Sequence, residues 1–169
     1  MSTRRRILNF FDGENGTYIY STFSQDQIGK IKGVSYDKAS NTLTLDNVKR
    51  DENLITNVMG DDFKILLKGD NSLKSIIVWG DGYGGNLTIT GHGKLILNSE
   101  KTENMAITIQ AEYTEGKVKI EKNVQMEMYA KEGYPIIEIV GANNSDKDKA
   151  VVIDGKVTQN YEVDNILPK

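Results

Sequence analysis

Short apolar stretches, separated by polar and glycine-containing turns, run along most of the chain. Three of them read TLTL, KILL and LTIT, and their residues Leu43, Ile65 and Leu87 follow one another at a constant interval of 22 residues. Each stretch is too short for a helix, and its alternation or β-branching is typical of a β-strand. Because a constant interval between equivalent strands indicates a repeat architecture, we predict that these strands stack as successive coils of a β-solenoid.

The rest of the chain has the same character, so we predict an all-β fold, a parallel β-helix of about five coils. Strands are predicted at Thr17–Phe23, Leu54–Val58, Phe63–Leu67, Ser75–Trp79, Leu87–Thr90, Leu95–Leu97, Ala106–Ile109, Val118–Ile120, Val124–Met128, Ile136–Val140 and Val151–Ile153. The predicted interior consists of Leu43, Leu45, Ile65, Leu67, Leu87, Ile89, Leu95, Leu97, Ile107, Ile109, Ile137 and Ile139. Hairpin-like GDG, GHG and EGK links leave an antiparallel β-sandwich as the alternative.

The length of 169 residues favours one domain. We expect residues 1–32 to form an N-terminal cap, 33–158 the solenoid and 159–169 a C-terminal cap or tail. A cap is expected because the first coil of a solenoid exposes an apolar cross-section and unpaired strand groups. After Ile109 the interval loosens, and the longer polar segments there are interpreted as loops that project from one edge.

The segments GVSYDKASNTLTLDNV, DFKILLKGDNSL and GNLTITGHGKLIL lie between Gly33 and Leu97. They resemble β-solenoid modules found in large surface proteins of Gram-positive bacteria, some of which are labelled carbohydrate-binding. The resemblance implies a right-handed parallel β-helix and a surface or adhesive setting. It brings with it no diagnostic catalytic residue.

Composition narrows the range of partners. The 24 acidic residues exceed the 21 basic ones, and a net charge of −3 argues against nucleic acid, which normally needs a clustered basic face. The absence of cysteine excludes disulfides, thiolate metal sites and thiol nucleophiles. We find no transmembrane run and expect no membrane contact. The start MSTRRRILNFFDG has too few apolar residues for a secretory signal, so a cytosolic or virion setting is expected, or the cell surface if a leader was removed.

Candidate catalytic and metal-binding residues are few. His92 is the only histidine and is interpreted as a turn residue between two glycines. The glycine-rich loop at 81–86 lacks the acidic spacing of a calcium loop and is interpreted as a tight corner. Asp46 and Lys68 lie 22 residues apart, with Thr90 as the next equivalent, and predict a cross-strand ion pair rather than an active site. We therefore expect no catalysis, no metal and no cofactor.

Aromatic residues are the strongest candidates for binding. Trp79 and Tyr83 flank the GDG turn, and Tyr113, Tyr129 and Tyr134 fall in or beside the late, looser segments. Such side chains stack on sugar rings and also anchor protein interfaces. We take these five as the predicted ligand- or partner-binding residues, against the alternative that Trp79 packs into the solenoid.

The function expected from the sequence is that of a non-catalytic binding module with rigid faces. A protein partner is preferred, as for a phage- or mobile-element-borne inhibitor or a particle component. The alternative is a carbohydrate-binding or adhesion module of a bacterial surface protein, and a polysaccharide-active enzyme ranks third. The ends and faces of a solenoid would also permit a homo-oligomer.

Overall fold

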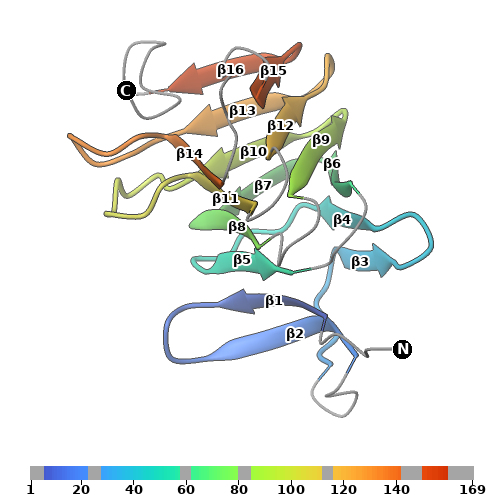
Figure 1. Cartoon of the computed structure of the whole chain (residues 1–169). Helices are drawn as coiled ribbons and strands as arrows, with labels where there is room; N and C mark the ends of the chain where they lie inside the picture. Colours follow the sequence, from blue (N-terminus) through green and yellow to red (C-terminus); the bar gives the residue numbers. More distant parts are fainter. Residues whose placement is uncertain are drawn as a thin grey trace.

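The computed structural model describes residues 6–22, 28–57, 62–79, 85–111, 116–141 and 150–159. They form sixteen β-strands in three sheets (Figure 1). Sheet A contains β1 (Ile7–Phe11), β2 (Gly16–Ser21), β5 (Asn53–Thr56), β8 (Ser75–Trp79), β11 (Ile107–Ala111) and β14 (Ile137–Gly141). Sheet B contains β3 (Val34–Asp37), β4 (Thr42–Asp46), β6 (Phe63–Lys68), β9 (Asn86–Gly91), β12 (Lys117–Ile120) and β15 (Val151–Ile153), and sheet C contains β7 (Asp70–Leu73), β10 (Lys94–Leu97), β13 (Gln125–Met128) and β16 (Lys156–Gln159).

The strands follow one another through the three sheets in a fixed order. From β6 onward, the chain visits sheet B, sheet C and sheet A in turn, and we call each such set of three strands a round. Each strand from β6 to β13 pairs in parallel with the strand three places further along the chain. The molecule is therefore all-β, with parallel strands in stacked sheets, and this part of the predicted fold is confirmed (Figure 1).

The register confirms one part of the predicted repeat and corrects another. Leu43 pairs with Ile65, so the strands at these positions are neighbours as predicted. Ile65, however, pairs with Ile89, whereas Leu87 pairs with Phe63. The interval of 22 residues therefore does not extend to a third strand. Leu87 and Ile89 both point inward. Because the side chains of a strand alternate with period 2, a shift of two residues in the pairing leaves the apolar pattern unchanged. The sequence pattern therefore cannot reveal this shift.

The interior between the three sheets is continuous and apolar. Eleven of the twelve predicted interior residues are buried, and Ile139 is only partly buried against the same cluster. The interior also includes Leu8 and Phe10 of β1, as well as Met126 and Met128 of β13. Each such side chain contributes about 1.5–3 kcal/mol when it leaves water, so this column is the main source of stability.

Strands of opposite direction cover β4 and β5, which precede the first round. β1 pairs antiparallel with β5 and with β2, while β3 pairs antiparallel with β4. The turn into β3 needs glycine at position 33, where φ is +82° and a Cβ atom would clash with the backbone oxygen of Asp46. No strand of the described residues covers sheet C in the same way, where only a bridge between Lys49 and Ser72 extends it below β7.

Loops lengthen along the chain at the corner between sheets C and A. A single residue, Lys74, joins β7 to β8, whereas residues 98–106 join β10 to β11 and residues 129–136 join β13 to β14. Both long loops project from the same edge of the molecule (Figure 1), and we call them the shelf loops. Lys131 in one forms an ion pair of 2.9 Å with Glu103 in the other.

Candidate functional site

The outer face of sheet A carries the predicted binding residue Trp79. Its side chain is 39% exposed, so it does not pack into the interior. Trp79 pairs with Gln110, which pairs with Val140, and Val140 is 47% exposed. The outward-facing Ile77 lies two residues before Trp79 and is partly exposed. Trp79, Ile77, Gln110 and Val140 form a strip near the ends of three parallel strands, which we call the Trp79 strip; it is apolar except at Gln110, which separates Trp79 from Val140.

The other predicted aromatic residues do not join this strip. Tyr134 is 37% exposed in the second shelf loop, which leads into the start of β14, whereas Trp79 lies at the end of β8. Because β8, β11 and β14 are parallel and in register, the two side chains lie at opposite ends of sheet A. Tyr83 and Tyr113, like Asp81, lie outside the described residues.

Tyr129 belongs to a hydrogen-bonded network on the outer face of sheet C. Its hydroxyl donates a hydrogen bond of 2.8 Å to Oε1 of Glu127, whose Oε2 lies 2.5 Å from Nζ of Lys94. The Lys94 ammonium and the Tyr129 hydroxyl lower the pKa of Glu127, and the same contacts raise the pKa of both partners. The charges of Lys94 and Glu127 neutralise each other, so we interpret this arrangement as a structural feature of the face and not as a binding site.

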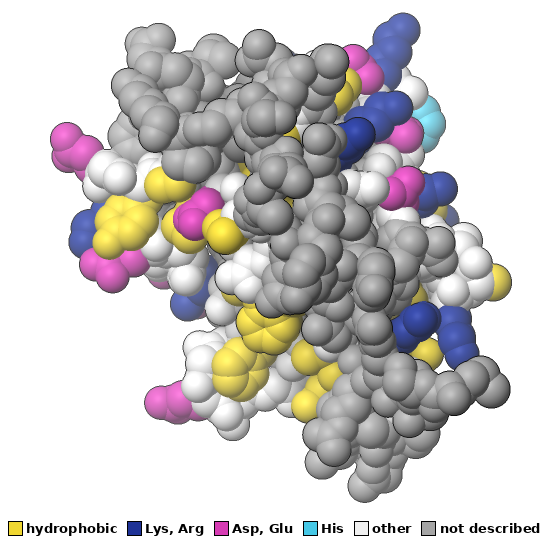
Figure 2. Space-filling model, viewed as in Figure 1, with side chains coloured by type: hydrophobic (Ala, Val, Ile, Leu, Met, Phe, Trp, Pro, Cys, Tyr) yellow, Lys and Arg dark blue, Asp and Glu magenta, His cyan; other side chains and the backbone are white. Residues whose placement is uncertain are grey.

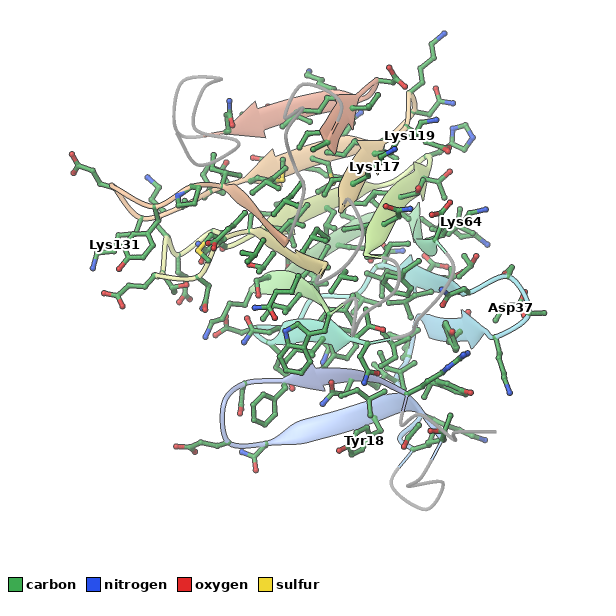
Figure 3. All side chains as sticks on the ribbon, in the orientation of Figure 1. Tyr18, Asp37, Lys64, Lys117, Lys119 and Lys131 are labelled. Carbon is green, nitrogen blue, oxygen red and sulfur yellow. The ribbon has the colours of Figure 1, made fainter. Side chains whose placement is uncertain are left out.

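The outer face of sheet B presents a different arrangement, which the sequence analysis did not single out. Lys64 of β6 pairs with Thr88 of β9, and Thr88 pairs with Lys119 of β12. Lys117 lies on the same face two residues earlier, and all three lysines are exposed. Figure 3 shows them on one side of the molecule, where Figure 2 also shows lysine and arginine side chains in dark blue. The alternation in KILL and KVKI is the sequence signal that places these lysines outward.

Two adjoining hollows lie beside sheet C, one between the tight corner at Lys74 and the first shelf loop, the other below residues 46–50. Their volumes are about 320 and 810 Å³, and they share Lys49 and Arg50. Arg50 is already engaged, since it forms an ion pair of 2.6 Å with Glu52 and lies 5.0 Å from the centre of the Phe10 ring. Among the described residues that line the hollows none is aromatic, so the hollows offer no stacking platform.

The remaining polar candidates are spread over separate turns and strands. Asp46 pairs in register with Lys68 as predicted, but the expected ion pair between them is absent from the described residues. Thr90 pairs with Leu66 instead of continuing that row, because of the same two-residue shift, and its hydroxyl donates a hydrogen bond of 2.7 Å to Glu121. His92 is exposed in the turn between β9 and β10. Over the described ranges, no group of three or more His, Cys, Asp or Glu residues is close enough to hold a metal ion.

No family model, curated protein or solved structure matches the chain. The resemblance to surface-protein modules therefore stays a prediction. In the part of the chain that the structure describes, no helix is long and apolar enough to span a membrane.

Proposed function

We propose that the chain is a right-handed parallel β-helix that serves as a non-catalytic binding module for a protein partner. The proposed coil is supported by the repeated passage through sheets B, C and A with parallel pairing at every step. A right-handed path is supported by the strong preference of parallel β-crossover connections for that hand. Short corners such as Lys74 hold the sheets rigidly, so little entropy is lost when a face docks.

The observation that carries the proposal is the exposed Trp79 strip. The strip presents an aromatic ring at Trp79, with the aliphatic Ile77 on the same strand and the aliphatic Val140 two strands away, across Gln110. Tryptophan is enriched among residues that dominate the energy of protein interfaces, and contiguous exposed apolar groups mark such interfaces. The aliphatic side chains of Ile77 and Val140 favour a protein partner over a sugar ring, since Gln110 is the single polar side chain among the named residues of the strip.

The test compares two exposed aromatic residues at opposite ends of sheet A. The purified chain is used to isolate a partner, and the dissociation constant for that partner is measured for the wild type, Trp79→Ala and Tyr134→Ala. We expect Trp79→Ala to weaken binding by at least tenfold and Tyr134→Ala to change it by less than threefold, because only Trp79 lies in the strip. Circular dichroism checks that both variants stay folded.

Two results would overturn the proposal. One is a partner whose affinity is unchanged by Trp79→Ala. The other is saturable binding on a glycan array that Trp79→Ala abolishes while no protein partner is recovered. In that case the glycan function replaces the protein function.

A further inference from the structure

The two ends of the stack of sheets differ in how well they cover the interior. At the first end, β1 and β3 run antiparallel to the strands they cover, and Leu8 and Phe10 of β1 are fully buried. At the other end, β14, β15 and β16 each pair with only one of the described strands (Figure 1). Four apolar side chains there are only partly buried, although their pairing partners one round earlier are buried. They are Ile139, Val151, Ile153 and Val157.

The outer edge of β14 offers backbone groups to a further strand. The oxygen of Ile136 accepts a hydrogen bond of 3.2 Å from the N–H of Ile107 in β11. Because backbone groups alternate in direction along a strand, those of Glu138 also face β11, and those of Ile137 and Ile139 face the open edge. β14 is five residues long and contains neither lysine nor proline, which commonly protect an exposed edge. It is therefore suited to pair with another strand.

The corner between β15 and β16 carries one charge of each sign. Asp154 and Lys156 stand on either side of Gly155, and both are exposed. Within the described residues, no ion pair involves either of them. Because the three sheets enclose one interior, this corner lies opposite the middle of sheet A, where Ile139 is the central residue of β14. A single line through Ile139 and Gly155 therefore crosses the last round from the middle of one sheet to the opposite corner.

We propose that two copies of the chain form a dimer through their last rounds, related by a twofold axis through Ile139 and Gly155. The inference rests on the coil proposed above and not on the binding of a partner by the Trp79 strip. The axis sets the two β14 strands antiparallel, so that Ile139 faces its own equivalent and the two residues exchange both backbone hydrogen bonds. Glu138 then lies opposite Val140 of the other copy, and not opposite a second glutamate.

The same axis matches the corner in charge and in polarity. Counting outward from Gly155, Asp154 of one copy lies opposite Lys156 of the other, and Ile153 lies opposite Val157. By symmetry each match occurs twice, so the dimer contains two new ion pairs and two new apolar contacts. The two exposed apolar cross-sections cover each other, and no like charges are opposed.

Closure and charge favour a second copy over the other occupants. A head-to-tail filament would need an open first end, but Leu8 and Phe10 are already buried there. A single strand from another protein would cover β14 but not the corner at Gly155 on the opposite side of the round. Residues 160–169 follow β16 directly and lie outside the described residues, so the experiment includes their removal.

The experiment measures the dissociation constant of the dimer of the full chain by sedimentation equilibrium. The test variant Lys156→Glu places like charges opposite each other at both symmetry-related contacts. The control variant Lys64→Glu makes the same change of charge at an exposed lysine of β6, away from the last round. We expect the dissociation constant to rise at least tenfold for the test variant and less than threefold for the control. Circular dichroism checks that both variants stay folded.

Further variants distinguish a contact in the dimer from a general effect of charge. Asp154→Lys combined with Lys156→Glu exchanges the two charges and should restore the wild-type dissociation constant to within threefold. Ile139→Pro removes an N–H that faces the open edge, so the chain should still fold but should not dimerise. Trp79→Ala lies outside the contact and should leave the dimer intact, so this proposal and the function proposed for the Trp79 strip can fail separately.

Several results would overturn the dimer. The full chain would be monomeric at every concentration, or it would form assemblies that keep growing beyond two copies. Lys156→Glu would weaken association no more than Lys64→Glu, or the exchange of charges would fail to restore it. A chain that ends at Gln159 tests the remaining occupant. If this shorter chain dimerises while the full chain does not, residues 160–169 occupy the edge of β14 and the proposal is wrong.

Discussion

Sheets B and C are built from the same rounds of the chain, yet they differ both inside and outside. The inner row of sheet B is apolar throughout, with Leu43, Ile65 and Ile89 in register. The inner row of sheet C begins instead with Asn71, which is 1% exposed and precedes Leu95 in register. Outside, sheet C pairs Lys94 with Glu127, whereas sheet B leaves its lysines without an ion pair among the described residues.

The two sheets differ in where their polar side chains lie, although they share one architecture. Asn71 is tolerated inside because its amide accepts a hydrogen bond of 2.7 Å from the backbone N–H of Val48 and donates one of 3.0 Å to the oxygen of Lys68. A buried polar group costs little when it is bonded in this way. Sheet C thus uses polar side chains to hold neighbouring rounds together. Sheet B has an apolar interior, and its polar side-chain contacts, such as Thr90 with Glu121 and Asn86 with Asp62, lie on its outer side.

The largest expected effect is on the interior of sheet B. Ile65→Ala removes a fully buried side chain between Leu43 and Ile89, so we expect a loss of about 2–5 kcal/mol in the free energy of unfolding. Urea denaturation followed by circular dichroism measures it. Leu66→Ala, on the outer face of the same strand, is the control and should cost clearly less. Equal losses for the two variants would show that the interior of sheet B is not the main support.

A smaller loss is expected inside sheet C. Asn71→Leu fits the apolar surroundings but leaves the Val48 N–H without its acceptor, so we expect a loss of about 1–3 kcal/mol. The same denaturation experiment measures it, with Ser72→Ala on the outer face as control. If Asn71→Leu were as stable as the wild type, the hydrogen bonds of Asn71 would not stabilise sheet C, and the interiors of sheets B and C would differ only in residue type.

The smallest effect is expected on the outer face of sheet C, where the ion pair is open to solvent. Lys94 and the Tyr129 hydroxyl hold the pKa of Glu127 below its ordinary value of 4.5. The contribution of this carboxylate to stability is therefore complete above about pH 4.5 and is lost as the pH falls through its lower, folded-state pKa. Lys94→Gln should raise that pKa toward the ordinary value, as followed by NMR titration of the Glu127 carboxyl carbon. An unchanged titration would mean that the pair does not persist in solution.

Apolar alternation was sufficient to predict the class of the fold, and eleven of the twelve residues predicted for its interior are buried, although many other interior residues were not in that set. Leu43 and Ile65 identified neighbouring strands because both are buried and lie opposite each other in the paired register. Strand β7 escaped prediction, since its inward position is taken by Asn71 and only Leu73 remains as an apolar signal. Strand β3 likewise lacked a continuous pattern, as its partly buried residues are Val34 and Tyr36.

The candidate binding surfaces were harder to predict. Exposure of Trp79 depends on which side of β8 it occupies, and Val140, which lies two strands away in the same row, comes 61 residues later in the chain. Only the three-dimensional register brings these two side chains into one row and separates Tyr134 from them. The row of Lys64 and Lys119 was missed for the same reason, because rounds of unequal length hide their alignment.

The first shelf loop is closed by a single residue, Asn98. This residue adopts a positive φ of 54° and is 2% exposed. Its side-chain amide donates hydrogen bonds to the backbone oxygens of Thr102 and Asn104, and to that of Tyr129 in the next round. The loop is thus fastened at its base, while its tip at Ser99 and Glu100 is exposed. We expect that new sequence inserted at the tip would leave the stacking of the rounds undisturbed. Binding specificity could therefore diversify at this corner, in evolution or by grafting, with little loss of stability.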